Sequence, residues 1–236
     1  MEITIKKYNG INVLRDDLLP GGTKAVLMPY ILKGNDHFVY ASPVYGGFQI
    51  ALSIYCKENN LKSTIFCARR KNWHSNTVLA KIYGANIKEC YPGYLSVVEK
   101  KAREYCEETG ATKLKFGANS EKSINILSNR MEQVSKKMGD EPDEIWVAIG
   151  SGTLVDSILK GTKTAKIYGV QVGAEYEKSH ERLTVLKYHK SFDKKSTLIK
   201  DFPSIENYDL KAWEYCLNHY KIYPINNKNV LFWNVL

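Results

Sequence analysis

The stretch Ile145-Trp-Val-Ala-Ile-Gly-Ser-Gly-Thr-Leu-Val-Asp-Ser-Ile-Leu159 decides the fold of this chain. Its first five residues are apolar, which is typical of a strand buried on both faces, and the apolar spacing at its end predicts a helix. The loop between strand and helix consists of Gly150, Ser151, Gly152 and Thr153. Glycines, hydroxyls and the N–H groups of a helix start suit a phosphate, although the same residues also make an ordinary capped turn. The loop lacks the lysine of a P-loop and the third glycine of a dinucleotide fingerprint.

Length and composition limit the fold class. The chain has 236 residues, 44% of them hydrophobic, which is enough for one large or two small domains with a real core. Its apolar runs are shorter than the about 18 residues of a membrane span, and residues 1–5 lack the apolar core of a signal peptide. We therefore expect a cytoplasmic protein that does not bind a membrane.

The cysteines and the net charge indicate which metal sites, disulfides and binding partners to expect. The cysteines are odd in number and form no Cys-x-x-Cys pair, which argues against a disulfide framework and against a zinc site or any other metal site. We expect buried free thiols at Cys56, Cys67, Cys90, Cys106 and Cys216. The formal net charge of +9 favours anionic partners, nucleic acid among them, or reflects a general preference for lysine.

A lysine follows a Pro-Gly-Gly turn near the N-terminus. Residues 3–8 and 11–15 predict two strands joined at Asn9-Gly10, a strong hairpin signal. The turn then leads to Lys24, at the start of a predicted apolar helix over 25–32. A lysine in this position lies near the core, where its pKa can be lowered and its amine can act as a nucleophile; the alternative is an ordinary surface lysine.

Two segments of this region resemble a known family. Arg15-Asp-Asp-Leu18 and Gly21-Gly-Thr-Lys24 resemble the Arg-Glu-Asp-Leu and Gly-Gly-Asn-Lys segment of the fold-type II pyridoxal-phosphate enzymes, the tryptophan synthase beta-like superfamily. The nearest branch is that of aminocyclopropane-carboxylate deaminase and D-cysteine desulfhydrase. The resemblance implies that Lys24 carries pyridoxal 5'-phosphate as a Schiff base and that Gly150 to Thr153 hold its phosphate. It covers nearly the whole chain, in a shortened form, and we expect a homodimer.

The rest of the chain alternates predicted strands and helices. Strands are expected at 38–42, 63–67, 87–90, 113–116, 145–149, 166–172 and 229–236, and helices at 46–56, 76–83, 94–108, 124–138 and 210–220. This alternation predicts an α/β fold with parallel sheets and helices on both sheet faces, with ligands beyond the carboxyl ends of the strands. With the resemblance it implies two lobes within one unit, a small lobe of about 36–120 and a large lobe of 1–35 plus 121–236.

One loop at a predicted strand end is similar to the family's substrate loop. Ser42-Pro-Val-Tyr-Gly-Gly-Phe-Gln49 resembles the Ser-x-Gly-Asn-x-Gly segment that holds the substrate carboxylate. Gly46 and Gly47 at a helix start also make an anion site plausible on physical grounds. Tyr45 stands where the family has Asn, either as a catalytic phenol or as a packing aromatic.

Three further segments contribute candidate binding residues. Asn119 and Ser120 lie in a loop that resembles the family's Gly-Gly-Ser-Asn loop near the cofactor. Arg69 and Arg70 belong to a basic loop, 69–74, which attracts an anionic substrate or is simply a solvated loop. The basic segment 178–195 is predicted to be a loop or flap, and its interleaved aromatics indicate a possible DNA-binding surface.

The C-terminus resembles the family's closing strand, in which a Thr pairs with the pyridine nitrogen of the cofactor. Val235 falls at the Thr position, and its neighbour Asn234 is the candidate to make this contact. Without an acid at that nitrogen, the cofactor withdraws electrons less strongly.

The resemblance implies a pyridoxal-phosphate-dependent lyase that acts at the alpha carbon of an amino-acid substrate, by deamination, elimination or decarboxylation. Lys24 and Tyr45 are the candidate catalytic residues. The alternative is an enzyme of DNA base hypermodification acting on an amino-acid group attached to a thymine, because short virus-encoded relatives resemble this chain in size and the chain is basic. A third hypothesis is a catalytically inactive scaffold.

Overall fold

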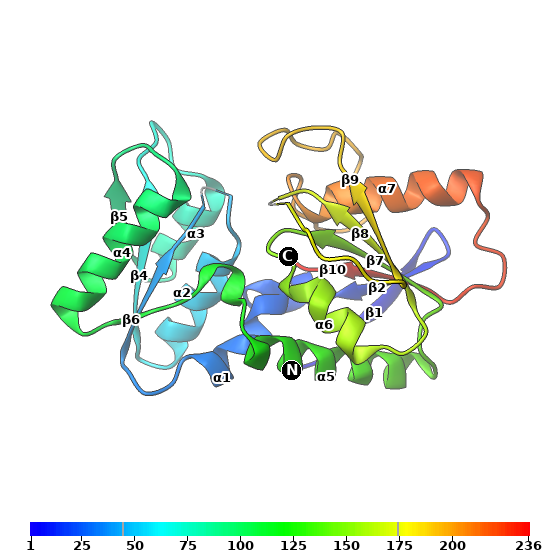
Figure 1. The fold of residues 1–236 in the computed structure, drawn as a ribbon, viewed down its shortest axis with the longest axis horizontal. Coiled ribbons are helices and arrows are strands. Elements are labelled where there is room, and N and C mark those ends of the chain that lie inside the picture. Colours follow the sequence, from blue (N-terminus) through cyan, green and yellow to red (C-terminus); the bar gives the residue numbers. More distant parts are fainter. Residues whose placement is uncertain (44, 174) are drawn as a thin grey trace. The chain divides into compact units, whose positions relative to one another are not determined.

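The computed structural model describes residues 1–43, 45–173 and 175–236, and it divides the chain into two compact units (Figure 1). Unit 1 consists of Met1–Thr23 and Asn119–Leu236, and unit 2 of Lys24–Ala118. The division along the chain therefore falls directly before Lys24, whereas the sequence-based boundaries were drawn near residues 35 and 120. Val44, in the predicted substrate loop, lies outside the described residues.

Unit 1 contains a six-stranded sheet in the order β1-β2-β10-β7-β8-β9. These strands are β1 (Ile5–Tyr8), β2 (Ile11–Arg15), β10 (Val230–Asn234), β7 (Glu144–Ile149), β8 (Lys166–Gln171) and β9 (Leu183–Lys187). Neighbouring strands are parallel except in the β1–β2 hairpin. Asn9 and Gly10 turn this hairpin with positive φ, so the predicted hairpin is confirmed.

Helices cover both faces of this sheet (Figure 1). The helices α5 (Glu121–Met138) and α6 (Thr153–Gly161) lie on one face, and α7 (Asp209–Ile222) lies on the other. Because side chains alternate along a strand, Trp146 and Phe232 point to α7 and form a core with Trp213, while Leu231 and Trp233 point to the opposite face. The predicted α/β fold, with helices on both faces, is confirmed.

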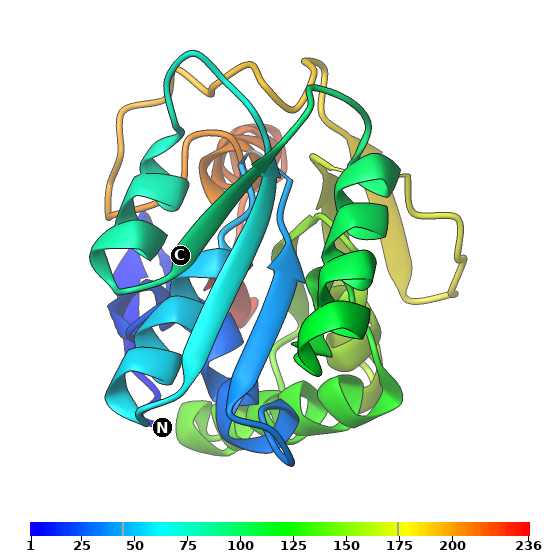
Figure 2. The same cartoon turned by 90° about the vertical axis from the view of Figure 1, so that its left-hand side faces the viewer.

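Unit 2 contains a second, fully parallel sheet in the order β5-β4-β3-β6. Its strands are β5 (Asn86–Cys90), β4 (Lys62–Ala68), β3 (His37–Ala41) and β6 (Thr112–Lys113). Figure 2 shows this sheet between α2 (Phe48–Glu58) and α3 (Ser75–Ile82) on one side and α4 (Leu95–Thr109) on the other. Val39 and Phe66 pack against Val98 and Ala102 of α4.

Two predicted elements are shorter than expected. The predicted helix over 25–32 is a 3-10 helix, η2 (Gly22–Leu27), followed by one turn of α-helix, α1 (Met28–Ile31). Pro29, which fits only the first turn of an α-helix, explains why the helix starts so late. The predicted strand 113–116 ends at Lys113, and the 3-10 turn η3 (Phe116–Ala118) with Gly117 at positive φ replaces its second half.

The prediction of a loop or flap over 178–195 is wrong for its centre. Residues 183–187 form β9, which pairs in parallel with β8 at the edge of the sheet. Residues 183–187 read Leu-Thr-Val-Leu-Lys, a run that itself indicates a strand, and the charged residues on either side of this short run obscured the signal. Tyr188, directly after β9, is buried and packs in the core on the α7 side.

The cysteines are free, as predicted. Four of them are buried, and Cys106 is half-buried. Burial raises the pKa of the Cys67 thiol to about 11, so this thiol is unreactive near neutral pH. Within the described ranges, no helix combines the length and the apolar character that crossing a bilayer requires.

Candidate active site

Lys24 lies in η2, at the start of unit 2, and its side chain is half-buried. Its Nζ donates a hydrogen bond to the carbonyl oxygen of Gly117 at 2.8 Å. Burial lowers the pKa of Lys24 from 10.5 to about 8, and no carboxylate of the described residues opposes this shift. Near pH 7 such a lysine has roughly 300-fold more neutral amine than an ordinary lysine. Lys24 is therefore suited to act as a nucleophile or a base.

The turn before Lys24 is held by the C-terminal segment of the chain. Thr23 N–H donates to the carbonyl of Val235 at 2.9 Å. Gly22 has φ +73°, and a Cβ at this position would lie 2.1 Å from the same carbonyl oxygen. Only glycine fits here, because both the backbone conformation and the close approach exclude a side chain.

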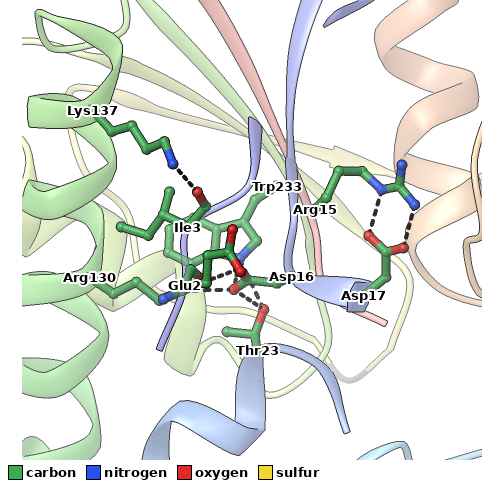
Figure 3. Close-up of polar contacts among 9 residues, drawn as sticks. All are labelled: Glu2, Ile3, Arg15, Asp16, Asp17, Thr23, Arg130, Lys137 and Trp233. Atoms are coloured by element: carbon green, nitrogen blue, oxygen red, sulfur yellow. Dashed lines mark hydrogen bonds and ion pairs between the residues drawn. The ribbon is translucent and has the colours of Figure 1, made fainter. Parts of the chain in front are cut away.

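Asp16 explains why acidic residues precede this turn (Figure 3). Its buried carboxylate accepts hydrogen bonds from Thr23 Oγ1 at 2.8 Å and from Trp233 Nε1 at 3.0 Å. Arg130 of α5 forms an ion pair with the same carboxylate. Since these described partners of Asp16 all lie in unit 1, the network fixes Thr23, the residue to which Lys24 is joined.

Two further contacts in Figure 3 belong to the same region. Arg15 forms a two-pronged ion pair with Asp17, at 2.8 and 2.7 Å, and both side chains are almost fully buried. Lys137 of α5 donates to the carbonyl of Ile3. The Arg-Asp-Asp segment, on which the family resemblance depends, thus serves to hold the segment that leads to Lys24.

The anion loop, residues 150–153, follows β7 and opens α6. Gly152 is the N-cap residue of α6, with φ +81°. A Cβ at Gly150 would lie 2.7 Å from Tyr208 Oη, and one at Gly152 would lie 2.6 Å from the ring of Tyr176. Both glycines are required, because aromatic rings occupy the places of their side chains.

Polar groups of this loop face the start of α6. The hydroxyls of Ser151 and Thr153 lie 3.1 Å apart, and Thr153 is fully buried. The first N–H groups of a helix have no intrahelical acceptor, and the helix dipole favours negative charge at this end. The hydroxyls and the helix start of this loop suit an anion on physical grounds.

The predicted substrate loop lies in unit 2, between β3 and α2. Ser42 is buried and donates to the carbonyl of Pro43 at 3.0 Å. A Cβ at Gly46 would lie 2.9 Å from Ser42 Oγ, and Gly47 is the N-cap residue of α2. Tyr45 packs edge-on against the ring of His74, with ring centroids 5.0 Å apart. The loop therefore presents a helix start flanked by a buried hydroxyl and a phenol.

Residues 117–120 join the two units along the chain. Gly117, at φ +62°, receives the hydrogen bond from Lys24 and donates its own N–H to Tyr40 Oη at 3.5 Å. Ser120 accepts from the N–H of Ser123 and so acts as the N-cap of α5, while Asn119 is exposed. The sequence did not show that the carbonyl of Gly117 would be the acceptor for Lys24, because the two residues are 93 positions apart.

The basic loops differ in their surroundings. Arg69 and Arg70 are exposed after β4, and the Arg69 N–H donates to the carbonyl of Cys90 at 2.8 Å. In the segment 178–195, by contrast, the hydroxyl of Tyr188 donates to Glu214 at 2.7 Å from a buried position. That aromatic ring belongs to the core and does not form a stacking surface.

The end of β10 brings together one predicted residue and one that sequence reasoning missed. Asn234 is fully buried on the α7 face of the sheet, and its Nδ2 donates to the carbonyl of Pro203 at 2.8 Å. Asp209, the first residue of α7, is also fully buried and accepts from the N–H of Leu236 at 3.2 Å. In the sequence Asp209 has the pattern of an ordinary acid at a helix start, which gives no sign of burial.

Comparisons with known proteins agree with this picture. A family model described as "Pyridoxal-phosphate dependent enzyme" matches residues 20–224. An aminocyclopropane-carboxylate (ACC) deaminase homologue has a similar structure, with a TM-score of 0.80 and 19% identity over 95% of this chain and 83% of that one. A fungal L-serine ammonia-lyase from Rhizomucor miehei has a TM-score of 0.73 and 15% identity over 99% of this chain and 92% of that one. A hydrogen sulfide-producing enzyme from Fusobacterium nucleatum has a TM-score of 0.74 and 12% identity over the same two shares. These identities show a shared fold, and a search of curated proteins found no match.

Proposed function

The chain belongs to the pyridoxal-phosphate dependent enzymes, and from this premise we propose that it is a lyase acting at the alpha carbon of an amino-acid substrate, with the cofactor attached through Lys24. The observation that carries the proposal is the amine of Lys24, which desolvation gives a pKa of about 8, far below that of an ordinary lysine, and which donates to the carbonyl of Gly117. The turn before it is held by the buried Asp16 network.

The residues of the chain fit the separate groups of pyridoxal phosphate. Lys24 offers an amine for the aldehyde, and the anion loop offers hydroxyls and a helix start for the phosphate. Asn234 offers a fully buried Oδ1 that has no hydrogen-bond partner in the described part of the chain, which suits the ring nitrogen. We therefore assign Lys24, Gly150, Ser151, Gly152, Thr153 and Asn234 to the cofactor.

When bound, pyridoxal phosphate withdraws electrons from the alpha carbon of an amine joined to it, which weakens a bond at that carbon. In this proposal Lys24 moves the proton, because its Nζ holds or releases a proton near neutral pH. The Gly117 carbonyl orients the Nζ group through the hydrogen bond it accepts.

The substrate carboxylate is assigned to the loop before α2. Gly46 and Gly47 place N–H groups at the start of that helix, and Ser42 contributes a hydroxyl. Tyr45 is proposed as an acid, base or hydrogen-bond donor toward the substrate. Asn119, Ser120, Arg69 and Arg70 complete the proposed set of substrate-binding residues.

Two of the similar structures support a small amino acid as the substrate. One is described as an ACC deaminase homologue and the other as an L-serine ammonia-lyase. Deamination or elimination is therefore the first reaction to test, followed by decarboxylation. The proposal includes a homodimer, which sedimentation of the purified protein would test.

The direct experiment is to add pyridoxal phosphate to the purified protein and record its visible absorbance. We expect a yellow protein whose band shifts with some members of a panel of free amino acids, accompanied by release of ammonia, sulfide or carbon dioxide. A colourless protein that takes up no cofactor would overturn the proposal. Uptake without a response to any amine would instead indicate an inactive scaffold.

A second candidate function has one observation in its favour. Arg69, Arg70 and Lys71 are exposed in the loop after β4. Tyr91 and Tyr94, in the loop after the neighbouring strand β5, are 84% and 86% exposed. Exposed cations beside exposed aromatic rings are typical of surfaces that bind nucleic acid. The substrate would then be an amino-acid group attached to a thymine base in DNA.

Salt dependence distinguishes this candidate from the first. Each phosphate contact contributes a slope of about −0.9 to the logarithmic plot of DNA affinity against salt concentration. Replacing Arg69 and Arg70 with alanine should flatten this slope by roughly one unit per lost contact. The matched control replaces Lys57 and Lys81, exposed lysines of the same unit, and should leave the slope unchanged. Negligible DNA binding at low salt would rule the second candidate out.

A further inference from the structure

Buried oxygens without a hydrogen-bond partner are concentrated in one part of unit 1. Among the described residues there are five such atoms, and three of them belong to Ser204, Asp209 and Asn234. Asp209 and Asn234 are both fully buried. An unpaired buried polar group destabilises the folded state, so folded proteins rarely keep several near one another. Their grouping indicates a place where a polar ligand supplies a hydrogen-bond partner.

Two contacts show that these residues are neighbours. Asp209 Oδ2 accepts the N–H of Leu236, which lies two positions beyond Asn234. Asn234 Nδ2 donates to the carbonyl of Pro203, the residue before Ser204. Because Pro203 presents an acceptor, the amide of Asn234 must direct its NH₂ group there, and its Oδ1 faces another way. Asn234 Oδ1 is therefore an acceptor, whereas the Ser204 hydroxyl and the Asp209 carboxyl can each donate or accept, according to their protons.

The same edge of the sheet carries the anion loop. Tyr208, the residue before Asp209, donates to the carbonyl of Ala148 at 3.4 Å, and its ring occupies the side-chain position of Gly150. The strands β10 and β7 are parallel neighbours, with Phe232 opposite Trp146. Neighbouring strands lie about 4.8 Å apart, so the end of β10 is beside the end of β7, from which the anion loop starts.

We propose that Asp209 is the direct partner of the cofactor's ring nitrogen and that Asn234 Oδ1 lies beside it as a second acceptor. The assignment rests on the proposed function, since it takes the ligand to be pyridoxal phosphate. That molecule carries a phosphate for the anion loop and, when its ring is protonated, one N–H donor at the far side of the ring. A phosphate site and an unpaired carboxyl on one sheet edge match these two groups.

The proton of this contact is shared between the Asp209 carboxyl and the ring nitrogen, so no other group has to supply it. Burial raises the pKa of Asp209 well above the ordinary carboxyl range, while hydrogen bonds from the N–H groups of Val235 and Leu236 oppose this shift and the nearby charge of Asp17 adds to it. A carboxyl with a raised pKa can bring a proton to this contact. On binding, the O–H bond of Asp209 would break and an N–H bond would form on the ring, which would leave a carboxylate beside a positively charged ring.

This contact changes the chemistry expected from the sequence. Asn234 alone is an uncharged partner and leaves the ring a weak acceptor of electrons. A carboxylate keeps the ring nitrogen protonated, so the cofactor withdraws electrons from the substrate more strongly. The chain would then have an acid at this position in place of the Thr of the relatives it resembles.

The test is nitrogen NMR of the wild-type protein loaded with pyridoxal phosphate carrying ¹⁵N in its ring. The chemical shift distinguishes a protonated from an unprotonated ring nitrogen without reference to activity. We expect a protonated nitrogen in the wild-type protein near pH 7.5. In Asp209→Asn the amide can donate but cannot hold the proton, and we expect an unprotonated nitrogen. The control Asp193→Asn makes the same chemical change at a half-exposed position and should match the wild type.

Cofactor affinity gives a second readout. Replacing the ring nitrogen of pyridoxal phosphate with a C–H group should weaken binding to the wild-type protein about ten- to hundredfold, as expected for loss of a charged hydrogen bond, and should weaken binding to Asp209→Asn much less. An unprotonated nitrogen in the wild type, or a protonated one in Asp209→Asn, would overturn the assignment while visible cofactor on Lys24 upholds the proposed function. A protein that takes up no pyridoxal phosphate would overturn both.

Discussion

Two lysines of this chain have lowered pKa values but different surroundings. Lys24 belongs to unit 2 and Lys211 to unit 1. Burial lowers the pKa of both side chains. Lys211 Nζ donates to the carbonyls of Ser191 and Phe192, at 3.0 and 3.2 Å, and lies 4.8 Å from the centre of the Tyr188 ring. Lys24 Nζ has one described acceptor, the carbonyl of Gly117.

The difference separates two uses of a buried amine. Lys211 joins the irregular segment 188–208 to α7 with several contacts that suit a charged ammonium. Lys24 has little that stabilises its charge, so the neutral and reactive form is within reach near neutral pH. Burial alone therefore does not mark a functional lysine; the number and kind of partners do.

The largest effect is expected on attachment of the cofactor. Lys24→Met should lose the visible band completely and reduce turnover on the order of a thousandfold or more, because no other group replaces its amine. Lys211→Met should keep the band at full height once folded. Absorbance spectra of the two loaded variants measure this directly, and equal loss in both would remove the distinction between the two lysines.

The free energy of unfolding should change more in the Lys211 variant than in the Lys24 variant. Lys211→Met should lower the free energy of unfolding by about 2–3 kcal/mol, since two carbonyls lose a charged donor and an aromatic ring loses its cation. Lys24→Met should leave stability unchanged or raise it. Urea unfolding of the cofactor-free proteins measures both, with Lys190→Met as an exposed control. A Lys24 variant less stable than the Lys211 variant would contradict the comparison.

The pH dependence of stability should single out Lys24. Its pKa is about 8 in the folded protein and near 10.5 when unfolded, so between these values the unfolded chain binds more protons. The cost of charging Lys24 is fully present below pH 8 and disappears as the pH rises to 10.5. The wild type should therefore gain on the order of 1–2 kcal/mol relative to Lys24→Met across this window, after allowance for partial solvent access. Parallel curves for the two proteins would show that Lys24 is not perturbed.

The smallest effect concerns the anion loop. Thr153→Val keeps the shape of a fully buried side chain but removes its hydroxyl. Cofactor affinity should fall about tenfold, while the visible band at saturating cofactor stays intact, because the amine is untouched. Titration of the band measures this, and Thr184→Val on β9 is the control. An unchanged affinity would mean that this hydroxyl does not contact the phosphate.

Local patterns explain how much of this was predictable from sequence. The hairpin at Asn9-Gly10 and the strand, loop and helix over 145–159 follow from turn chemistry and apolar spacing, and both are confirmed. The edge strand β9 was missed because its short apolar run, Leu183 to Leu186, lies between charged flanks, and the whole of 178–195 was taken as one basic loop. Its position is determined by pairing with β8, which no short window of sequence contains.

The site was less predictable, because its decisive contacts join distant residues. The sequence indicated that Lys24 would be near a core, but its acceptor Gly117 is 93 positions away. Asp16 and Arg130 are 114 positions apart, so their ion pair could not be predicted from the sequence around either residue. Asp209 had the pattern of a surface acid at a helix start, and only the fold shows that both it and Asn234 are buried.

The central claim, that Lys24 and no other lysine carries the cofactor, has one direct measurement. The protein loaded with pyridoxal phosphate is treated with borohydride, which makes the lysine attachment permanent, and the modified peptide is identified by mass spectrometry. We predict a single modified peptide that contains Lys24, present in the wild type and in Lys211→Met and absent in Lys24→Met. Modification of Lys211, or modification spread over many lysines of this basic chain without a preference for Lys24, would contradict the account.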